Sequence, residues 1–150
     1  MLQLVVVLLT GIGLGCSSTP PKYPEDHARF ERIVAAIETL RSAYVEEDIQ
    51  TIQDLLLPLE DLKRFEKEVE QDFQVFSNIS LDFSIERINI QEALITVHIQ
   101  WQGGWEKSEG QLPLHVRGHG ILELSGNKVI LLAAVGGDLP FGMASRQSLL

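Results

Sequence analysis

The stretch SLDFSIERINIQEALITVHIQWQGG, residues 80–104, decides the fold of this chain because its apolar residues recur at every second position. A period of two is typical of a β-strand with one buried face and one exposed face. The alternation shifts by one residue partway along, since Ile88 and Ile90 lie out of step with the apolar residues before them. This shift predicts a β-bulge near Glu86-Arg87.

Three further signals predict a four-stranded antiparallel meander. A second strand is expected from Ala93 to Trp101, and Gln-Gly-Gly at residues 102–104 predicts a turn after it. Ser125-Gly126-Asn127 predicts a hairpin turn into a buried final strand at residues 128–137. A third strand is expected at residues 111–124, where one face carries Leu112, Leu114, Val116, Leu122 and Leu124.

The sequence before the strands has the period of helices. Residues 25–48 and residues 59–76 carry apolar side chains at spacings of three and four, and a short helix between them is stopped by Pro58. Charged residues on the other side of the third helix indicate a solvated face. The apolar positions are Phe30, Ile33, Ile37, Leu40 and Tyr44 in the first helix, and Leu59, Leu62, Phe65, Val69, Phe73 and Phe76 in the third. Helices followed by a meander predict an α+β domain with N-terminal helices packed on a curved antiparallel four-stranded sheet.

The N-terminus has the pattern of a secretion signal. Residues 2–14 form an apolar run that is too short to span a membrane, which needs about 20 residues, and the only cysteine, Cys16, follows shortly after it. Gly13-Leu14-Gly15-Cys16 resembles the lipobox of bacterial lipoproteins, where a peptidase cuts before a lipidated cysteine. An ordinary cleaved signal or a disordered tail is the alternative. We expect a signal peptide at residues 1–15, a lipidated tether at 16–25, one α+β domain at 26–142 and a C-terminal tail at 143–150.

Lipid attachment at Cys16 predicts where the protein resides. By the same resemblance, Ser17 after the cysteine implies sorting to the outer membrane, with the domain on its periplasmic side. The formal net charge is −9, so the chain lacks the clustered basic residues that bind nucleic acid, and its attachment to a membrane must be hydrophobic. We expect a membrane contact through the lipid anchor and no nucleic-acid partner.

The order of the predicted elements and two short segments resemble a known superfamily. RINIQEALITVHIQWQG, residues 87–103, and NKVILLAAVGGDLPFG, residues 127–142, are similar to the central strands and closing strand of the nuclear transport factor two-like superfamily. The resemblance covers about residues 26–142 and implies a cone-like fold that also houses polyketide cyclases and ketosteroid isomerase. Enzymes of this fold use a carboxylate or a His/Asp dyad inside the cone.

No ionisable residue of the predicted strands shares a face with the apolar core positions, so we identify no catalytic residue and expect no cofactor. Four residues are candidates for a ligand mouth at the rim of the cone: Tyr44, Asp48, Trp101 and Trp105. Aromatic side chains at a rim can line a ligand site, or they can plug the open end of a small core. Asp48 has the alternative role of a helix-terminus residue.

The polar face of the sheet is a candidate interface for a second copy or another protein, by analogy with relatives that pair through their sheets. Its candidate residues are His98, His115, Arg117 and His119. His115 and His119 are not expected to share a metal ion, because four residues of a strand cover about 13 Å. We therefore expect no metal site.

These observations together predict a non-enzymatic cell-envelope lipoprotein whose cone-like domain binds a small apolar ligand or a protein partner. The alternatives are a small isomerase or cyclase of the same fold, and an interaction protein whose cone is filled. An ionisable group deep in the cone would favour the enzyme, and fully buried tryptophans would favour the filled cone.

Overall fold

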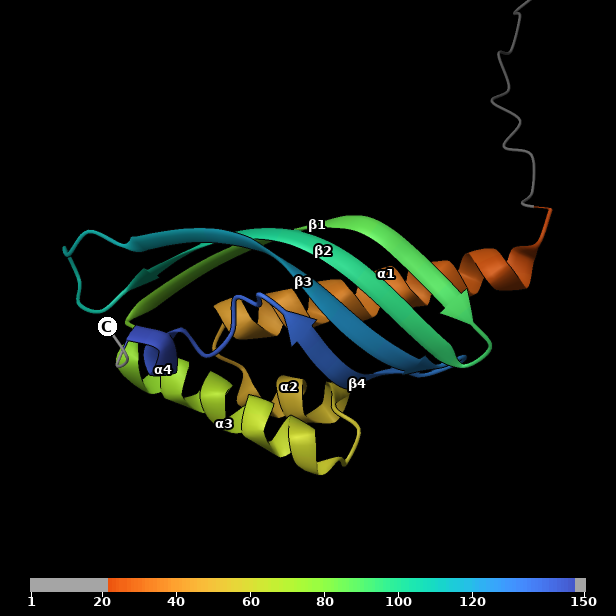
Figure 1. The fold of residues 1–150 in the computed structure, drawn as a ribbon, viewed down its shortest axis with the longest axis horizontal. Coiled ribbons are helices and arrows are strands. Elements are labelled where there is room, and N and C mark those ends of the chain that lie inside the picture. Colours follow the sequence, from red (N-terminus) through yellow and green to blue (C-terminus); the bar gives the residue numbers. More distant parts are fainter. Residues whose placement is uncertain (1–21, 148–150) are drawn as a thin grey trace, which may run out of the picture.

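The computed structural model describes residues 22–147, which form one layer of helices against one curved sheet (Figure 1). The sheet is four-stranded and antiparallel, with its strands in chain order, so the predicted α+β meander is confirmed. The elements are α1 (Pro24–Val45), α2 (Ile49–Leu55), α3 (Glu60–Val75), β1 (Asn78–Gln91), β2 (Leu94–Glu106), β3 (Leu114–Gly126), β4 (Ile130–Gly137) and α4 (Met143–Gln147).

The strand register follows the alternation in the sequence. Ile85 pairs with Ile99 and Arg87 pairs with His98, which leaves Glu86 as the extra residue of the predicted bulge. The bulge keeps Ile88 on the same face as Val97, its partner in β2. That face points toward the helices, and Ile95, Val97, Ile99 and Trp101 are all buried on it.

The turn predicted at residues 102–104 is wrong, because β2 continues through both glycines to Glu106. The glycines serve packing at this point. A Cβ atom on Gly103 would lie 2.5 Å from Cη2 of Trp105, so the indole ring occupies the space that a side chain would need. Residue 103 is therefore limited to glycine by its neighbour within the same strand.

The helices bury the residues that the periodicity selects, with exceptions at the ends of elements. Most of the predicted positions in α1 and α3 are in the core: Ile33, Ile37, Leu40, Tyr44, Leu62, Phe65, Val69 and Phe76. Leu59 is nearly half exposed at the N-cap of α3, and Phe30, in the N-terminal third of α1, is exposed to a similar degree. Leu112 is 97% exposed because it precedes β3, and Leu114 lies at the strand's first residue and is also exposed, so both were wrongly assigned to the core.

The segment after β4 is ordered against α3. The tail expected from residue 143 begins with the short helix α4, and Met143 is buried beside the core. Figure 1 shows α4 next to the C-terminal end of α3. None of the helices within residues 22–147 is both long and apolar enough to cross a membrane.

Candidate functional site

The interior of the cone is filled by the chain's own C-terminal segment. Phe141 is buried between the helices and the sheet, and its ring lies 4.9 Å from the ring of Tyr44 and 5.1 Å from that of Phe65, measured between centroids. A third edge-on contact, at 6.3 Å, joins it to Phe83 of β1. Edge-to-face packing of this kind is favourable for aromatic rings, so Phe141 fills the space between the helices and the sheet at this point.

A buried carboxylate, Asp72 of α3, lies beside this aromatic cluster and is fully shielded from solvent. Its Oδ2 accepts hydrogen bonds from the Tyr44 hydroxyl and the Gly142 amide, both at 2.7 Å, and its Oδ1 accepts one from the Ala144 amide, also at 2.7 Å. The Trp105 indole N–H donates in turn to the Tyr44 oxygen at 2.9 Å. Asp72 thus joins α1, α3, β2 and the N-terminus of α4.

The electrostatics of Asp72 reflect two opposing effects. Burial raises the pKa of the Asp72 carboxyl group, and the hydrogen bonds from Ala144, Tyr44 and Gly142 act in the opposite direction without overcoming it. The pKa of Tyr44 is also raised, mainly by burial and then by the nearby charge of Asp72. The carbonyl oxygen of Pro140, 3.3 Å from the Tyr44 hydroxyl, is a second acceptor for that hydroxyl.

Sequence reasoning missed Asp72, although its spacing was visible. Leu62, Phe65, Val69, position 72 and Phe76 follow one another at spacings of three and four, so residue 72 faces the core as directly as its apolar neighbours do. The prediction placed Phe73 on that face because it is apolar, and Phe73 is only partly buried. An acidic residue at a helical core position was the available signal.

The two tryptophans are buried in the core, where they form a T-shaped pair with ring centroids 6.1 Å apart. The Trp101 indole N–H donates to the Asp138 carbonyl oxygen at 2.7 Å. Gly118 of β3 makes room for that ring, because a Cβ atom there would lie 2.7 Å from Cζ2 of Trp101. Both indole donors are therefore satisfied within the protein.

The structure brings together three of the four residues predicted to form a ligand mouth. Tyr44, Trp101 and Trp105 are buried and hydrogen bonded, which corrects their expected place at an open rim and agrees with the alternative of a plugged core. Asp48 does not join them. It is exposed at the N-cap of α2, where its carboxylate accepts from the Thr51 amide at 3.1 Å, and hydrogen bonds from Thr51 lower its pKa.

The face of the sheet that points away from the helices is uncovered within the described chain, and we call it the outer sheet face. It carries all four candidate interface residues, His98, His115, Arg117 and His119. Two of these histidines have neighbours on β1: His98 lies 2.9 Å from Nη2 of Arg87, and His119 lies 3.4 Å from Glu86. An interface here stays a prediction.

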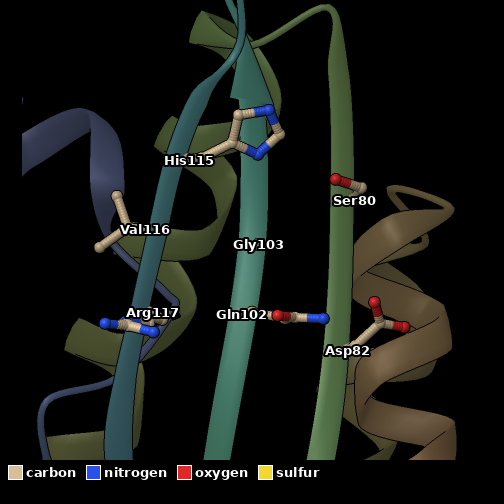
Figure 2. A pocket seen from close by; sticks show the side chains of 7 residues that line it. All are labelled: Ser80, Asp82, Gln102, Gly103, His115, Val116 and Arg117. Atoms are coloured by element: carbon tan, nitrogen blue, oxygen red, sulfur yellow. The ribbon is translucent and has the colours of Figure 1, made fainter.

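A hollow of about 460 Å³ lies on the outer sheet face, and Figure 2 shows its lining. Asp82 of β1, Gln102 of β2 and Arg117 of β3 lie level with one another across it, as register partners. A second, adjoining hollow of about 250 Å³ shares these three side chains. In the described part of the chain none of the three side chains forms a hydrogen bond or an ion pair.

Other kinds of site find less support in residues 22–147. No group of three or more His, Cys, Asp or Glu side chains within this range is arranged to hold a metal ion. The apolar space between α1, α2 and the sheet has a volume of about 10 Å³, which is no more than one water molecule requires. Cys16 lies outside the described residues.

Comparison with solved structures shows the fold. The chain superposes on a nuclear transport factor 2 (NTF2-like) superfamily protein from Salmonella enterica with a TM-score of 0.64 and 10% identity, covering 76% of this chain and 94% of that one. A conserved protein from Planctomyces limnophilus gives a TM-score of 0.62 at 19% identity, covering 73% and 98% of the two chains. A putative dehydratase of the NTF2-like family from Streptomyces avermitilis gives 0.62 at 10% identity, covering 75% and 99%. No family model and no curated protein matches the chain.

The chain therefore has the NTF2-like α+β cone fold, as its sequence predicted. This fold is shared by proteins of different activities, so it does not by itself define the function of this one.

Proposed function

We propose that this chain is a non-enzymatic lipoprotein of the bacterial cell envelope that binds a protein partner through its outer sheet face. The observation that carries this proposal is the contrast between the two sides of the sheet. The helical side is closed by buried aromatic residues, including Phe141 and Trp105. The outer side presents charged and amide groups that have no partner within the described chain.

The proposed attachment to the outer membrane rests on the sequence before the domain. An apolar run ends close to Cys16, and seven residue steps separate this cysteine from Tyr23, one residue before α1. Seven extended residues span at most about 25 Å, so a lipid on Cys16 would hold the domain close to the periplasmic surface of the membrane.

The test of the anchor is the variant Cys16→Ala. We expect this variant to accumulate as unprocessed precursor or as soluble protein, whereas the unchanged chain would sediment with the outer membrane and incorporate labelled palmitate. Unchanged membrane fractionation of Cys16→Ala would contradict lipid attachment at this residue.

The test of the partner surface compares two exposed glutamines on opposite sides of the domain. A photo-crosslinking amino acid at Gln100, on the outer sheet face, is expected to capture a defined protein in cells. The same group at Gln74 of α3 is the matched control, and it should capture none. Equal capture at both positions, or none at Gln100, would contradict the proposal.

A second candidate function is that of a small isomerase or cyclase, or of a protein that binds a small apolar ligand. Asp72 favours it, because an ionisable side chain lies deep in the cone. However, both oxygens of Asp72 already accept hydrogen bonds from this chain, and Phe141 fills the adjoining space. A ligand would have to displace the segment after β4.

Native mass spectrometry of the full chain separates the two candidates. An added mass that disappears on denaturation would support the ligand-binding candidate, and its identity would name the class of ligand. For the proposed function we expect the mass of the chain without a bound small molecule, together with complexes that contain the chain and another protein.

A further inference from the structure

Exposed apolar side chains gather at one end of the domain, which we call the tether end. It consists of residues 22–32 at the start of α1, the β1–β2 turn at residues 90–94 and the β3–β4 turn at residues 125–130. Five of the nine large apolar side chains that are exposed within residues 22–147 lie in these segments: Tyr23, Phe30, Ile90, Leu94 and Val129. Single exposed apolar residues are ordinary, but a group confined to one end indicates a contact surface.

Hydrogen bonds hold the three segments of the tether end together. Arg29 of α1 donates to the carbonyl oxygen of Glu92 and, at 2.9 Å, to that of Gly126. The Gly126 amide donates in turn to the Ala93 carbonyl oxygen at 3.0 Å, which joins the two turns. The apolar side chains of the tether end therefore belong to one surface.

The two aromatic residues of the tether end continue the buried face of α1. Tyr23 and Phe30 are seven residues apart, and Phe30 precedes Ile33 by three, so all three lie on one side of the helix. Ile33 is buried in the core, whereas Phe30 is 46% exposed and Tyr23 is 62% exposed. Figure 1 shows the start of α1 extending beyond the sheet, which leaves this part of the apolar stripe uncovered.

The tether end lacks the acidic excess of the chain. Its three segments hold four basic and four acidic residues, whereas the whole chain has a formal net charge of −9. Anionic lipid headgroups therefore repel the rest of the domain but not this end. The Nζ atom of Lys22 lies 5.6 Å from the centre of the Tyr23 ring, a pair whose cation suits lipid phosphates and whose ring suits the membrane interface.

We infer that the tether end lies in the headgroup region of the bilayer and forms a second membrane contact beside the lipid on Cys16. This inference rests on the lipid anchor of the proposed function. Seven residue steps join Cys16 to Tyr23, so the lipid and this end of the domain are at most about 25 Å apart. A tether of this length keeps the apolar side chains at a high local concentration near the membrane, where even a weak contact is occupied.

This contact sets the orientation of the domain. The loop between β2 and β3 lies at the opposite end of the long axis and would point away from the membrane (Figure 1). The strands run between the two ends, so the outer sheet face would stand clear of the bilayer and stay open to a protein partner.

The experiment places an environment-sensitive fluorescent amino acid at single positions of the full lipidated chain. The chain is held in vesicles of phosphatidylethanolamine and phosphatidylglycerol that carry a nitroxide on some acyl chains. Val129 of the tether end and Leu112 of the β2–β3 loop are matched sites, because both are highly exposed apolar residues outside the strands. We expect the probe at residue 129 to shift its emission to the blue and to be quenched, and the probe at residue 112 to show neither change.

A pair of substitutions tests whether the apolar side chains make this contact. With the probe at residue 129, Tyr23→Ser and Leu94→Ser together should weaken the contact with the bilayer about tenfold and restore most of the fluorescence. The matched pair Leu59→Ser and Leu112→Ser removes exposed apolar side chains elsewhere and should leave the quenching intact. Unchanged melting temperatures would show that all variants are folded.

Two results would overturn the inference: equal quenching at residues 129 and 112, or quenching at residue 129 that Tyr23→Ser and Leu94→Ser leave unchanged. A chain that sediments with the vesicles while neither probe is quenched would also overturn it, and the lipid anchor would stand. A chain that stays in the supernatant would overturn both. The partner surface is tested separately, by the capture of a protein from Gln100.

Discussion

Asp72→Asn tests whether the buried carboxylate holds the C-terminal segment on the cone. Asparagine has nearly the same shape as aspartate but offers one acceptor oxygen, whereas Asp72 accepts bonds on both oxygens. If the amide oxygen keeps the bonds from Tyr44 and Gly142, the amide NH₂ group must face the Ala144 N–H. The variant then loses one hydrogen bond to a charged acceptor and leaves a buried donor unpaired.

The expected cost is about 2 kcal/mol of unfolding free energy at pH 7. A hydrogen bond to a charged group contributes about 1.5–3 kcal/mol, and removal of a buried charge offsets part of the further loss from the unpaired donor. Urea unfolding followed by circular dichroism measures this difference. Asp54→Asn, at an exposed residue of α2, is the control and should change stability by less than about 0.5 kcal/mol.

The pH dependence of this difference has a defined sign. Because burial raises the pKa of Asp72 in the folded state, the unfolded chain loses this proton at lower pH than the folded chain does. The contribution of Asp72 to stability is therefore full below about pH 4, the pKa of an unfolded aspartate, and is lost as the pH rises through the folded pKa. The gap between the unchanged chain and Asp72→Asn should be largest at low pH. A gap that widens as the pH rises would refute the reasoning, since the amide donors would then have lowered the pKa.

Three further substitutions test the packing. Gly103→Ala should destabilise the domain by about 2 kcal/mol in urea unfolding, because its Cβ would lie 2.5 Å from the Trp105 ring, whereas Gly136→Ala has open space and should be nearly neutral. Phe141→Ala should cost about 4 kcal/mol and lower the melting temperature accordingly, and a small effect would mean that the C-terminal segment does not fill the cone. Asp48→Ala should cost about 1 kcal/mol through loss of the N-cap of α2, measured in the same way, and an unchanged stability would contradict that capping role.

The sequence alone predicted the order of the helices and strands. Each element buries one face, so the spacing of its apolar residues follows the geometry of a helix or of a strand. The change from a period of three and four to a period of two at residue 80 separates helices from strands, and the bulge at Glu86 follows from one shift in parity. The apolar face of β2 could be assigned for the same reason, because residues 95, 97, 99 and 101 are all apolar and all buried.

The tertiary structure decided those cases in which the local sequence is compatible with two different structures or roles. Gln-Gly-Gly is compatible with a turn, and only the Trp105 ring lying over Gly103 shows that the strand continues. The spacing of α3 places Asp72 at a core position, but the amides of Gly142 and Ala144 that satisfy its carboxylate lie 70 and 72 residues later in the chain. The sequence likewise places Asp82 and Arg117 on one face, but it is the register of three strands that sets them level across Gln102. Local patterns determine which face of an element is buried, whereas partners distant in sequence determine what a particular polar side chain does there.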